Sequence, residues 1–280
     1  MRKIAAEQVE AALVESRAGG DFDKTVHGLR RRCKKIRGLL RLVRPNFPHF
    51  DEENAAFGNA ADALSAARDA AVILETFVAL EKQGALQAVS AETTERLRRE
   101  LEENARRVAS AQDRAALLIG FGDAMVAAQQ RIERWTVKGR GFALLAPGLG
   151  NTYARLRKRM KAAERTGHDE AFHDWRKDAK GHWFHVGLFE DCAPDRLGAR
   201  RDQCDTMGEY LGDHHNLAVL TERLTALAGP LDESLAKVID ERKAVLAGKA
   251  FALGRQLTVE SPAELVARFE KFWKLLPKDT

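Results

Sequence analysis

The feature that most restricts the fold of this chain is an almost unbroken helical spacing of apolar residues. Apolar side chains recur at intervals of three and four residues along nearly the whole sequence, and only seven prolines interrupt them. This spacing places apolar side chains on one face of an α-helix. Apolar residues make up 45% of the chain and charged residues 31%, which is typical of a folded globular protein. Since alternating β-branched runs are missing, the sequence predicts an all-α fold.

Glycines, prolines and capping residues predict where the helices begin and end. One helix is expected over about 2–17, another from 21 or 23 to Arg44, where Pro45 stops it, and a long one over about 51–83. Further helices are expected over about 91–118, 123–137, 151–166, 169–191, 195–211, 214–227, 231–256 and 262–276. Gly120 and Gly122 are expected to separate two of them, and the glycine-rich segment 138–150 is the best candidate for a linker.

This linker divides the chain into two helical halves, 1–141 and 142–280, and a weak repeat relates them. One motif occurs twice with an offset of 146 residues, as His27, Arg30, Arg31 and Lys34 and again as His173, Arg176, Lys177 and Lys180. A second similarity, between the segments around Asp69 and Asp213, has an offset of 144 residues. The nearly equal offsets favour an internal duplication.

Positive charge is concentrated in the first copy of this motif, although the net charge of the chain is only +5. Nine cations and no acid lie between Lys24 and Arg44. On a helical wheel an arc of about 80° holds the first basic ridge, which consists of His27, Arg30, Lys34, Arg37 and Arg41. Arg31 and Lys35 flank this ridge. Because like charges on one helix face repel, and the ridge is roughly 30 Å long, it is suited to a linear polyanion.

The second half repeats this pattern with fewer cations. His173, Arg176, Lys177 and Lys180 form the second basic ridge. The preceding helix adds further candidates: Tyr153, Arg157 and Lys161 on one face, with Arg155 and Lys158 beside them. Two such ridges facing each other across a pseudo-twofold axis would form a basic groove.

Taken in order, these motifs resemble the CHAD domain, the conserved histidine α-helical domain. The two His-x-x-Arg motifs, Tyr153 with Arg157, the Arg68-Asp69 pair and the segment around Asp213 are similar to elements of that family. The likeness extends from about Phe22 to Trp273. The chain departs from the family at Trp183-Phe184, where an Arg-Tyr pair is usual, and the Glu-x-Glu-x-Lys motif of an accompanying triphosphate-tunnel domain does not occur.

This resemblance implies two four-helix-bundle-like halves around a central basic groove or pore. It also implies non-catalytic binding of inorganic polyphosphate and association with polyphosphate granules. The two histidines, the ridge cations and the Tyr153 helix would then contact the polymer. Arg68 is equally compatible with an ion pair to Asp69 inside the bundle, and Asp69 and Asp213 are expected to orient cations.

Other functions remain open at this stage. A nucleic-acid-binding protein would be expected to interleave aromatic, Asn or Gln side chains with its cations, and the segment 24–44 contains no Phe, Tyr, Trp, Asn or Gln. The same ridge is compatible with a scaffold that docks an acidic protein. An enzyme is not expected, because no phosphate-binding loop and no nucleophile elbow occurs.

No cofactor or metal is expected either. His182 and His185 lie three residues apart, but paired cysteines or further spaced ligands are missing. The three distant cysteines are typical of a reducing compartment. Because neither a signal peptide nor a long apolar run is present, a cytoplasmic location without membrane insertion is expected.

Overall fold

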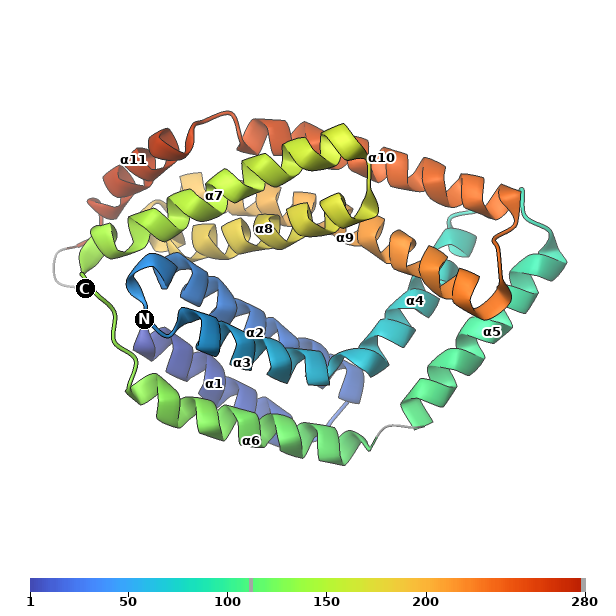
Figure 1. The fold of residues 1–280 in the computed structure, drawn as a ribbon, viewed down its shortest axis with the longest axis horizontal. Helices are drawn as coiled ribbons and strands as arrows, with labels where there is room; N and C mark the ends of the chain where they lie inside the picture. The colour runs from blue at the N-terminus through green and yellow to red at the C-terminus, as the bar shows by residue number, and fades with distance from the viewer. Residues whose placement is uncertain (111–112, 278–280) are drawn as a thin grey trace. The chain divides into compact units, whose positions relative to one another are not determined.

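The computed structural model describes residues 1–110 and 113–277, and only the backbone of residues 66–68. Within these residues the chain forms eleven α-helices, two short 3₁₀ segments and no β-strand, which confirms the all-α prediction (Figure 1). The helices are α1 (Arg2–Arg17), α2 (Phe22–Val43), α3 (Phe50–Ala63), α4 (Ser65–Lys82), α5 (Ala91–Ser110), α6 (Arg114–Glu133), α7 (Gly141–Thr166), α8 (Asp169–Leu188), α9 (Pro194–Ala228), α10 (Glu233–Leu257) and α11 (Pro262–Trp273).

The helices belong to two compact units. Unit 1 consists of Met1–Lys34, Ala56–Arg134 and Asp213–Val245, and unit 2 of Lys35–Ala55, Trp135–Gly212 and Leu246–Thr280. Four helices, α2, α3, α9 and α10, therefore contribute residues to both units. Each unit draws on both sequence halves, so the units do not correspond to 1–141 and 142–280. That division and the symmetry between the halves stay predictions.

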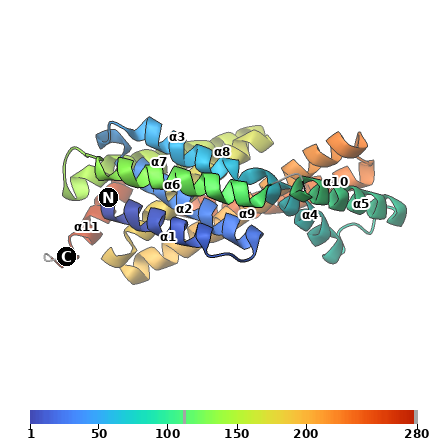
Figure 2. The ribbon, with the colours of Figure 1, turned by 90° about the horizontal axis from the view of Figure 1, so that it is seen from below.

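In unit 1, α1 packs beside α6, as both ribbon views show (Figures 1 and 2). Their buried faces carry the apolar residues that the helical spacing predicts, Val9 and Leu13 from α1 and Phe121 and Met125 from α6. Arg2 donates to the backbone oxygen of Glu133 at 3.2 Å. The helices α4 and α5 form a second packed pair in this unit.

In unit 2, α7 packs along α8, and α11 packs on α7. The core between them is rich in aromatic residues, with Trp175 and Phe269 fully buried and Trp175 stacked on Phe251 at 5.0 Å between ring centroids. The C-terminal part of α2 approaches this pair closely, because Gly38 faces Phe184. A Cβ atom at Gly38 would lie 2.9 Å from the Phe184 Cβ atom.

The predicted long helix over 51–83 is wrong, because the helix ends and restarts at Leu64. A continuous helix would join the amide of Ser65 to the carbonyl of Ala61. Instead, the Arg30 guanidinium donates to the Ala61 carbonyl at 2.6 Å and also to the Ser65 hydroxyl. Arg30, which is distant in sequence, therefore donates hydrogen bonds to a residue on each side of the break.

Two other predicted helix boundaries are also wrong. Gly120 and Gly122 lie inside α6, which begins at Arg114 after an N-cap by Asp113. The segments 195–211 and 214–227 form the single helix α9. Interior glycines cost a helix only about 1 kcal/mol each, which packing of the apolar face offsets.

The predicted linker over 138–150 is mostly helical. The helix α7 starts at Gly141 and continues through Pro147. Its glycine at position 148 permits close contact with α2, since a Cβ atom there would lie 1.9 Å from the Leu42 carbonyl oxygen. Gly148 therefore serves the close packing of α7 on α2 in unit 2.

None of the helices in the described part of the chain has both the length and the apolarity needed to cross a bilayer.

Candidate functional site

The N-terminal part of α2, in unit 1, presents a row of cations to solvent. Asp21 accepts from the Lys24 amide at 2.8 Å at the start of the helix, and Val26, Leu29 and Cys33 are buried. The opposite face exposes the four residues of the α2 stripe, namely Lys24, His27, Arg31 and Lys34. The exposed face is thus rotated from the predicted ridge toward Arg31.

Arg30 lies at the edge of this stripe and is half-buried. Its bond to Ala61 serves one of the last carbonyls of α3, which lack partners inside the helix. The positive guanidinium at that end also stabilises the helix dipole. Arg30 therefore has a structural role in unit 1, whatever it contributes to a ligand.

Arg32, which was not a candidate, forms an ion pair with Glu15 of α1 at 2.7 Å. Glu15 of α1 therefore compensates in part for the absence of acids between Lys24 and Arg44. At the end of the segment Arg44 pairs with Asp51 at 3.5 Å and covers the Phe50 ring at 4.4 Å.

The C-terminal part of α2, in unit 2, carries cations that are half-buried: Lys35, Arg37 and Arg41. Arg37 donates to the Asn54 side chain at 3.1 Å. Burial, reinforced by the neighbouring Arg37, lowers the pKa of Arg41 to about 10. Asp178 opposes this effect, whereas Arg155 and Arg44 add to it. Three guanidinium groups and one carboxylate thus act on the charge of Arg41.

The predicted residues of α7 lie on different faces of that helix. Arg155 pairs with Asp178 of α8 at 3.0 Å, so it takes part in the contact between α7 and α8. Lys158 and Lys161 are exposed. Arg157 is half-buried on the side of Glu264, whose pKa it helps to lower after the larger effect of hydrogen bonds at Ser261. Arg155 therefore faces α8, whereas Arg157 and Lys161 lie one turn apart along α7, the first half-buried and the second exposed.

Tyr153, predicted to contact the ligand, is fully buried in unit 2. Its hydroxyl lies 3.1 Å from the Leu257 carbonyl oxygen and 3.0 Å from that of Glu260. The His182 ring is tilted against its ring at 5.2 Å between centroids. Burial raises the pKa of Tyr153, so the phenol stays protonated and donates. In this structure Tyr153 anchors α7 to the end of α10, and it presents no group to a solvent-borne anion.

The second basic ridge on α8 is only partly exposed. Lys177 is exposed and pairs with Asp174 at 3.3 Å, whereas His173, Arg176 and Lys180 are half-buried. Burial lowers the pKa of His173, and Lys177 and Arg176 add to this effect. Burial also lowers the pKa of Lys180, with a further contribution from Arg176. A nearby anion would oppose both shifts, because an opposite charge favours the protonated forms of His173 and Lys180.

The remaining candidates give less information. The side chain of Arg68 lies outside the described residues, so its pairing with Asp69 stays a prediction. Asp69 on α4 and Asp213 on α9 are both exposed in unit 1. Their role in orienting a cation stays a prediction.

The paired histidines of α8 are buried and have defined partners. His185 Nε2 lies 3.0 Å from the Gly38 carbonyl oxygen, and His182 Nε2 accepts from Arg200 at 3.3 Å. Both rings are therefore engaged in packing α8 against its neighbours. Among the described residues no group of three or more His, Cys, Asp or Glu side chains is placed to hold a metal ion.

Sequence patterns did not point to several residues of these clusters. Lys24 shares the exposed face of α2 and could have been found from the same helical wheel. By contrast, the pairing of Asp178 with Arg155, and of Asp174 with Arg159 at 3.0 Å, depends on how α7 packs on α8. No local sequence signal predicts these contacts.

The family model of the CHAD domain matches residues 3–225 of the 280-residue chain. The matched range contains α2, α7 and α8, which carry the basic motifs, and leaves out α10 and α11. The resemblance is confirmed over this range, although it was expected to continue to about Trp273. A comparison with curated proteins finds no match.

Proposed function

Since this chain belongs to the CHAD domain family, we propose that it binds inorganic polyphosphate and catalyses no reaction. The observation that carries the proposal is the α2 stripe, four exposed basic side chains spaced at i, i+3, i+7 and i+10 along one helix. At 1.5 Å per residue the stripe is roughly 15 Å long. A linear polyanion lying along it would contact several of these side chains at once, whereas orthophosphate would contact only one or two.

The second support is the set of half-buried arginines in unit 2. The lowered pKa of Arg41 means that its surroundings disfavour the charged guanidinium. A phosphate group nearby would reverse this effect, because an opposite charge favours the ionised form. Arginine also suits phosphate through paired N–H donors, while lysine acts as a point charge.

The binding mechanism would be that of a polyelectrolyte. Cations of the protein replace the counterions condensed on the polymer, and release of these counterions drives association. Because the side chains project from preformed helices, little backbone ordering opposes binding. Affinity should therefore fall steeply with salt concentration. Association with polyphosphate granules in the cytoplasm is the location that follows from this proposal.

Nucleic acid and acidic proteins are the competing ligands of the same stripe. Nucleic acid is less favoured because no aromatic side chain is exposed beside Lys24, His27, Arg31 or Lys34 on the α2 face. A titration with long-chain polyphosphate, pyrophosphate, tRNA and duplex DNA at two salt concentrations separates these alternatives. Long-chain polyphosphate is expected to bind most tightly, and equal affinity per phosphate for all chain lengths would contradict binding along the stripe.

The site itself is tested with Arg31→Ala combined with Lys34→Ala. Both side chains are exposed, so the fold should tolerate the changes. Charge-assisted hydrogen bonds contribute about 1.5–3 kcal/mol each, so affinity should fall by at least tenfold. The matched control is Arg106→Ala with Arg107→Ala, two exposed cations of α5. An equal loss of affinity in both double variants would indicate diffuse charge attraction and not a site.

A further inference from the structure

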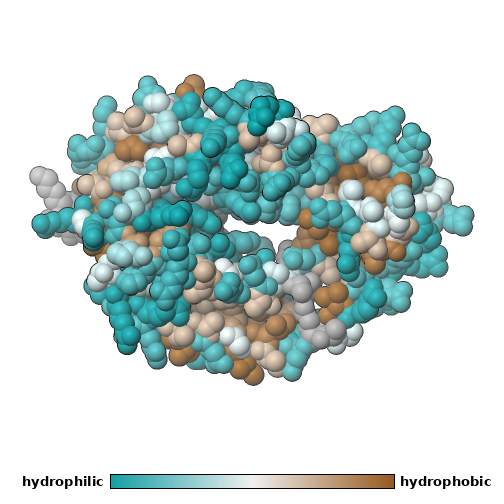
Figure 3. Space-filling model, in the orientation of Figure 1, coloured by the Kyte–Doolittle hydropathy of each residue, from teal (hydrophilic) through white to brown (hydrophobic). Residues whose placement is uncertain are grey.

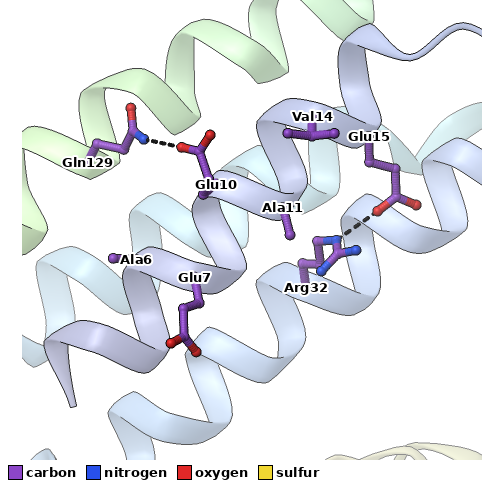
Figure 4. Close-up of a pocket in the computed structure, with 8 residues that line it drawn as sticks. All are labelled: Ala6, Glu7, Glu10, Ala11, Val14, Glu15, Arg32 and Gln129. Atoms are coloured by element: carbon purple, nitrogen blue, oxygen red, sulfur yellow. Dashed lines mark hydrogen bonds and ion pairs between the residues drawn. The ribbon is translucent and has the colours of Figure 1, made fainter.

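An open groove follows α1 in unit 1, and its lining includes none of the four residues of the α2 stripe. It has a volume of about 750 Å³. Figure 4 shows its residues, most of them on α1, with one each from α2 and α6. They are Ala6, Glu7, Glu10, Ala11, Val14, Glu15, Arg32 and Gln129.

The floor of this groove is apolar. Ala6, Ala11 and Val14 contribute small or branched hydrocarbon surface, and Val14 is 61% exposed. The core-facing side of α1 is formed by other residues, including Val9 and Leu13. Since a surface helix needs only one apolar face to pack on its own unit, the apolar groove is additional to that requirement.

Carboxylates surround the floor and are held in place. Glu10 accepts from the Gln129 side chain of α6 at 2.9 Å, and Glu15 accepts from Arg32 of α2 at 2.7 Å (Figure 4). Glu7 is exposed on the same helix. With three glutamates and one arginine, the groove residues carry a net charge of −2. The groove is thus negative, although the whole chain is positive.

The helix α6, which contributes Gln129 to the groove, also has exposed apolar side chains. Ile119 is 65% exposed and Val126 is 39% exposed, and on an α-helix both lie within about 80° of Gln129 at the groove. In the space-filling view, apolar residues reach the surface in the region of α6 (Figure 3). Exposed apolar surface of this kind, with a charged border, is typical of a protein interaction site.

We propose that the groove along α1 docks an amphipathic helix of a partner protein whose apolar stripe is flanked by lysine or arginine. The groove residues extend from Ala6 to Glu15, roughly 15 Å along the helix axis, which matches two to three turns of a docked helix. Such helices insert residues at i, i+3 or i+4, and i+7 into a groove. The carboxylates favour basic flanks and repel phosphate polymers and anionic lipid headgroups.

The probe is a synthetic 18-residue helical peptide with leucine at i, i+3, i+4 and i+7 spacing and lysine at the other positions. Its twin carries glutamate in place of every lysine. Fluorescence anisotropy with the full chain should give at least tenfold tighter binding of the lysine peptide, about 1.4 kcal/mol. Equal binding of the two peptides, or no binding of the lysine peptide, would overturn the proposal.

The groove is tested by Glu7→Lys combined with Val14→Ser, both at exposed positions. The matched control is Glu103→Lys with Val245→Ser, an exposed glutamate of α5 and a 49% exposed valine of α10, both in unit 1. The groove variant should lose at least tenfold in affinity for the lysine peptide, and the control less than twofold. Equal losses would contradict docking in the groove.

Two more readouts distinguish other occupants. Polyphosphate affinity should be the same in the groove variant and its control, because the groove lies outside the α2 stripe. Light scattering across a hundredfold range of concentration should show no self-association that depends on Glu7 and Val14. Self-association abolished by the groove variant would assign the groove to a second copy of the chain and overturn the proposed partner.

Discussion

Replacement of Gly148 by alanine tests whether α7 and α2 are packed as closely as the structure has them. The new Cβ atom would lie 1.9 Å from the Leu42 carbonyl oxygen and 2.8 Å from that of Arg41. Backbone atoms cannot rotate away, so α7 must move by about 1 Å to reach a tolerable contact. Overpacking of this kind costs about 1–3 kcal/mol or more, while the change from glycine to alanine in a helix recovers about 1 kcal/mol. Because backbone atoms form this contact, we take the upper end of the overpacking cost, about 3 kcal/mol, and expect a net loss of about 2 kcal/mol in the free energy of unfolding.

The measurement is urea unfolding followed by circular dichroism at 222 nm. The matched control is Gly120→Ala in α6, where no atom lies within 4 Å of the added Cβ position. This control should stabilise the protein by about 0.5–1 kcal/mol, since only helix propensity changes. The two substitutions are chemically identical, so opposite signs are expected from packing alone. A Gly148→Ala variant as stable as the wild type would refute the close approach of the two helices.

Tyr153→Phe should lower the free energy of unfolding by about 0.5–1.5 kcal/mol, measured by urea unfolding, and leave polyphosphate affinity unchanged, because the hydroxyl is buried in the core and donates to backbone carbonyls there. Burial lowers the pKa of His185 from 6.5 to about 4, so the unfolded chain binds a proton that the folded chain excludes. The contribution of neutral His185 to the free energy of unfolding should therefore be fully present above about pH 6.5 and be lost toward pH 4, by up to about 1.4 kcal/mol per pH unit. Urea titrations of His185→Gln should show a shallower decline with falling pH. Polyphosphate should reverse the lowered pKa of His173 and cause proton uptake near pH 6.5, which calorimetry in buffers of different ionisation enthalpy measures. The variant His27→Gln with His173→Gln should take up fewer protons, and uptake equal to that of the wild type would show that these histidines are not the groups titrated.

Local sequence patterns determined the helical content and the orientation of individual helices. In α2, Leu29, Ile36 and Leu40 follow one face of the helix, and the structure buries all three. The spacing of apolar residues suffices for this prediction, since burial of an amphipathic face depends mainly on the helical period. Prolines and caps were similarly informative, as Ser261 caps α11 and Pro262 is its first residue.

The extent of exposure along the basic ridges could not be predicted so well. The wheel grouped Arg30 with His27, yet Arg30 donates to the Ala61 carbonyl while His27 is exposed. Neighbouring helices decide which flank of a ridge stays open, and their positions are not encoded in the wheel. Tyr153 shows the same limit, because its i+4 relation to Arg157 suggested a shared surface and packing buried the tyrosine.

By itself, the sequence determined that this chain is helical, where its cations are concentrated and which family it resembles. Those properties depend on residue type and on spacing within a few turns. Only the tertiary structure decided that α3 ends beside Arg30, that Gly148 admits the backbone of Leu42, and that Asp178 opposes the arginines near Arg41. Each of these involves partners tens to more than a hundred residues apart, so it depends on how helices pack and not on the period of any one helix.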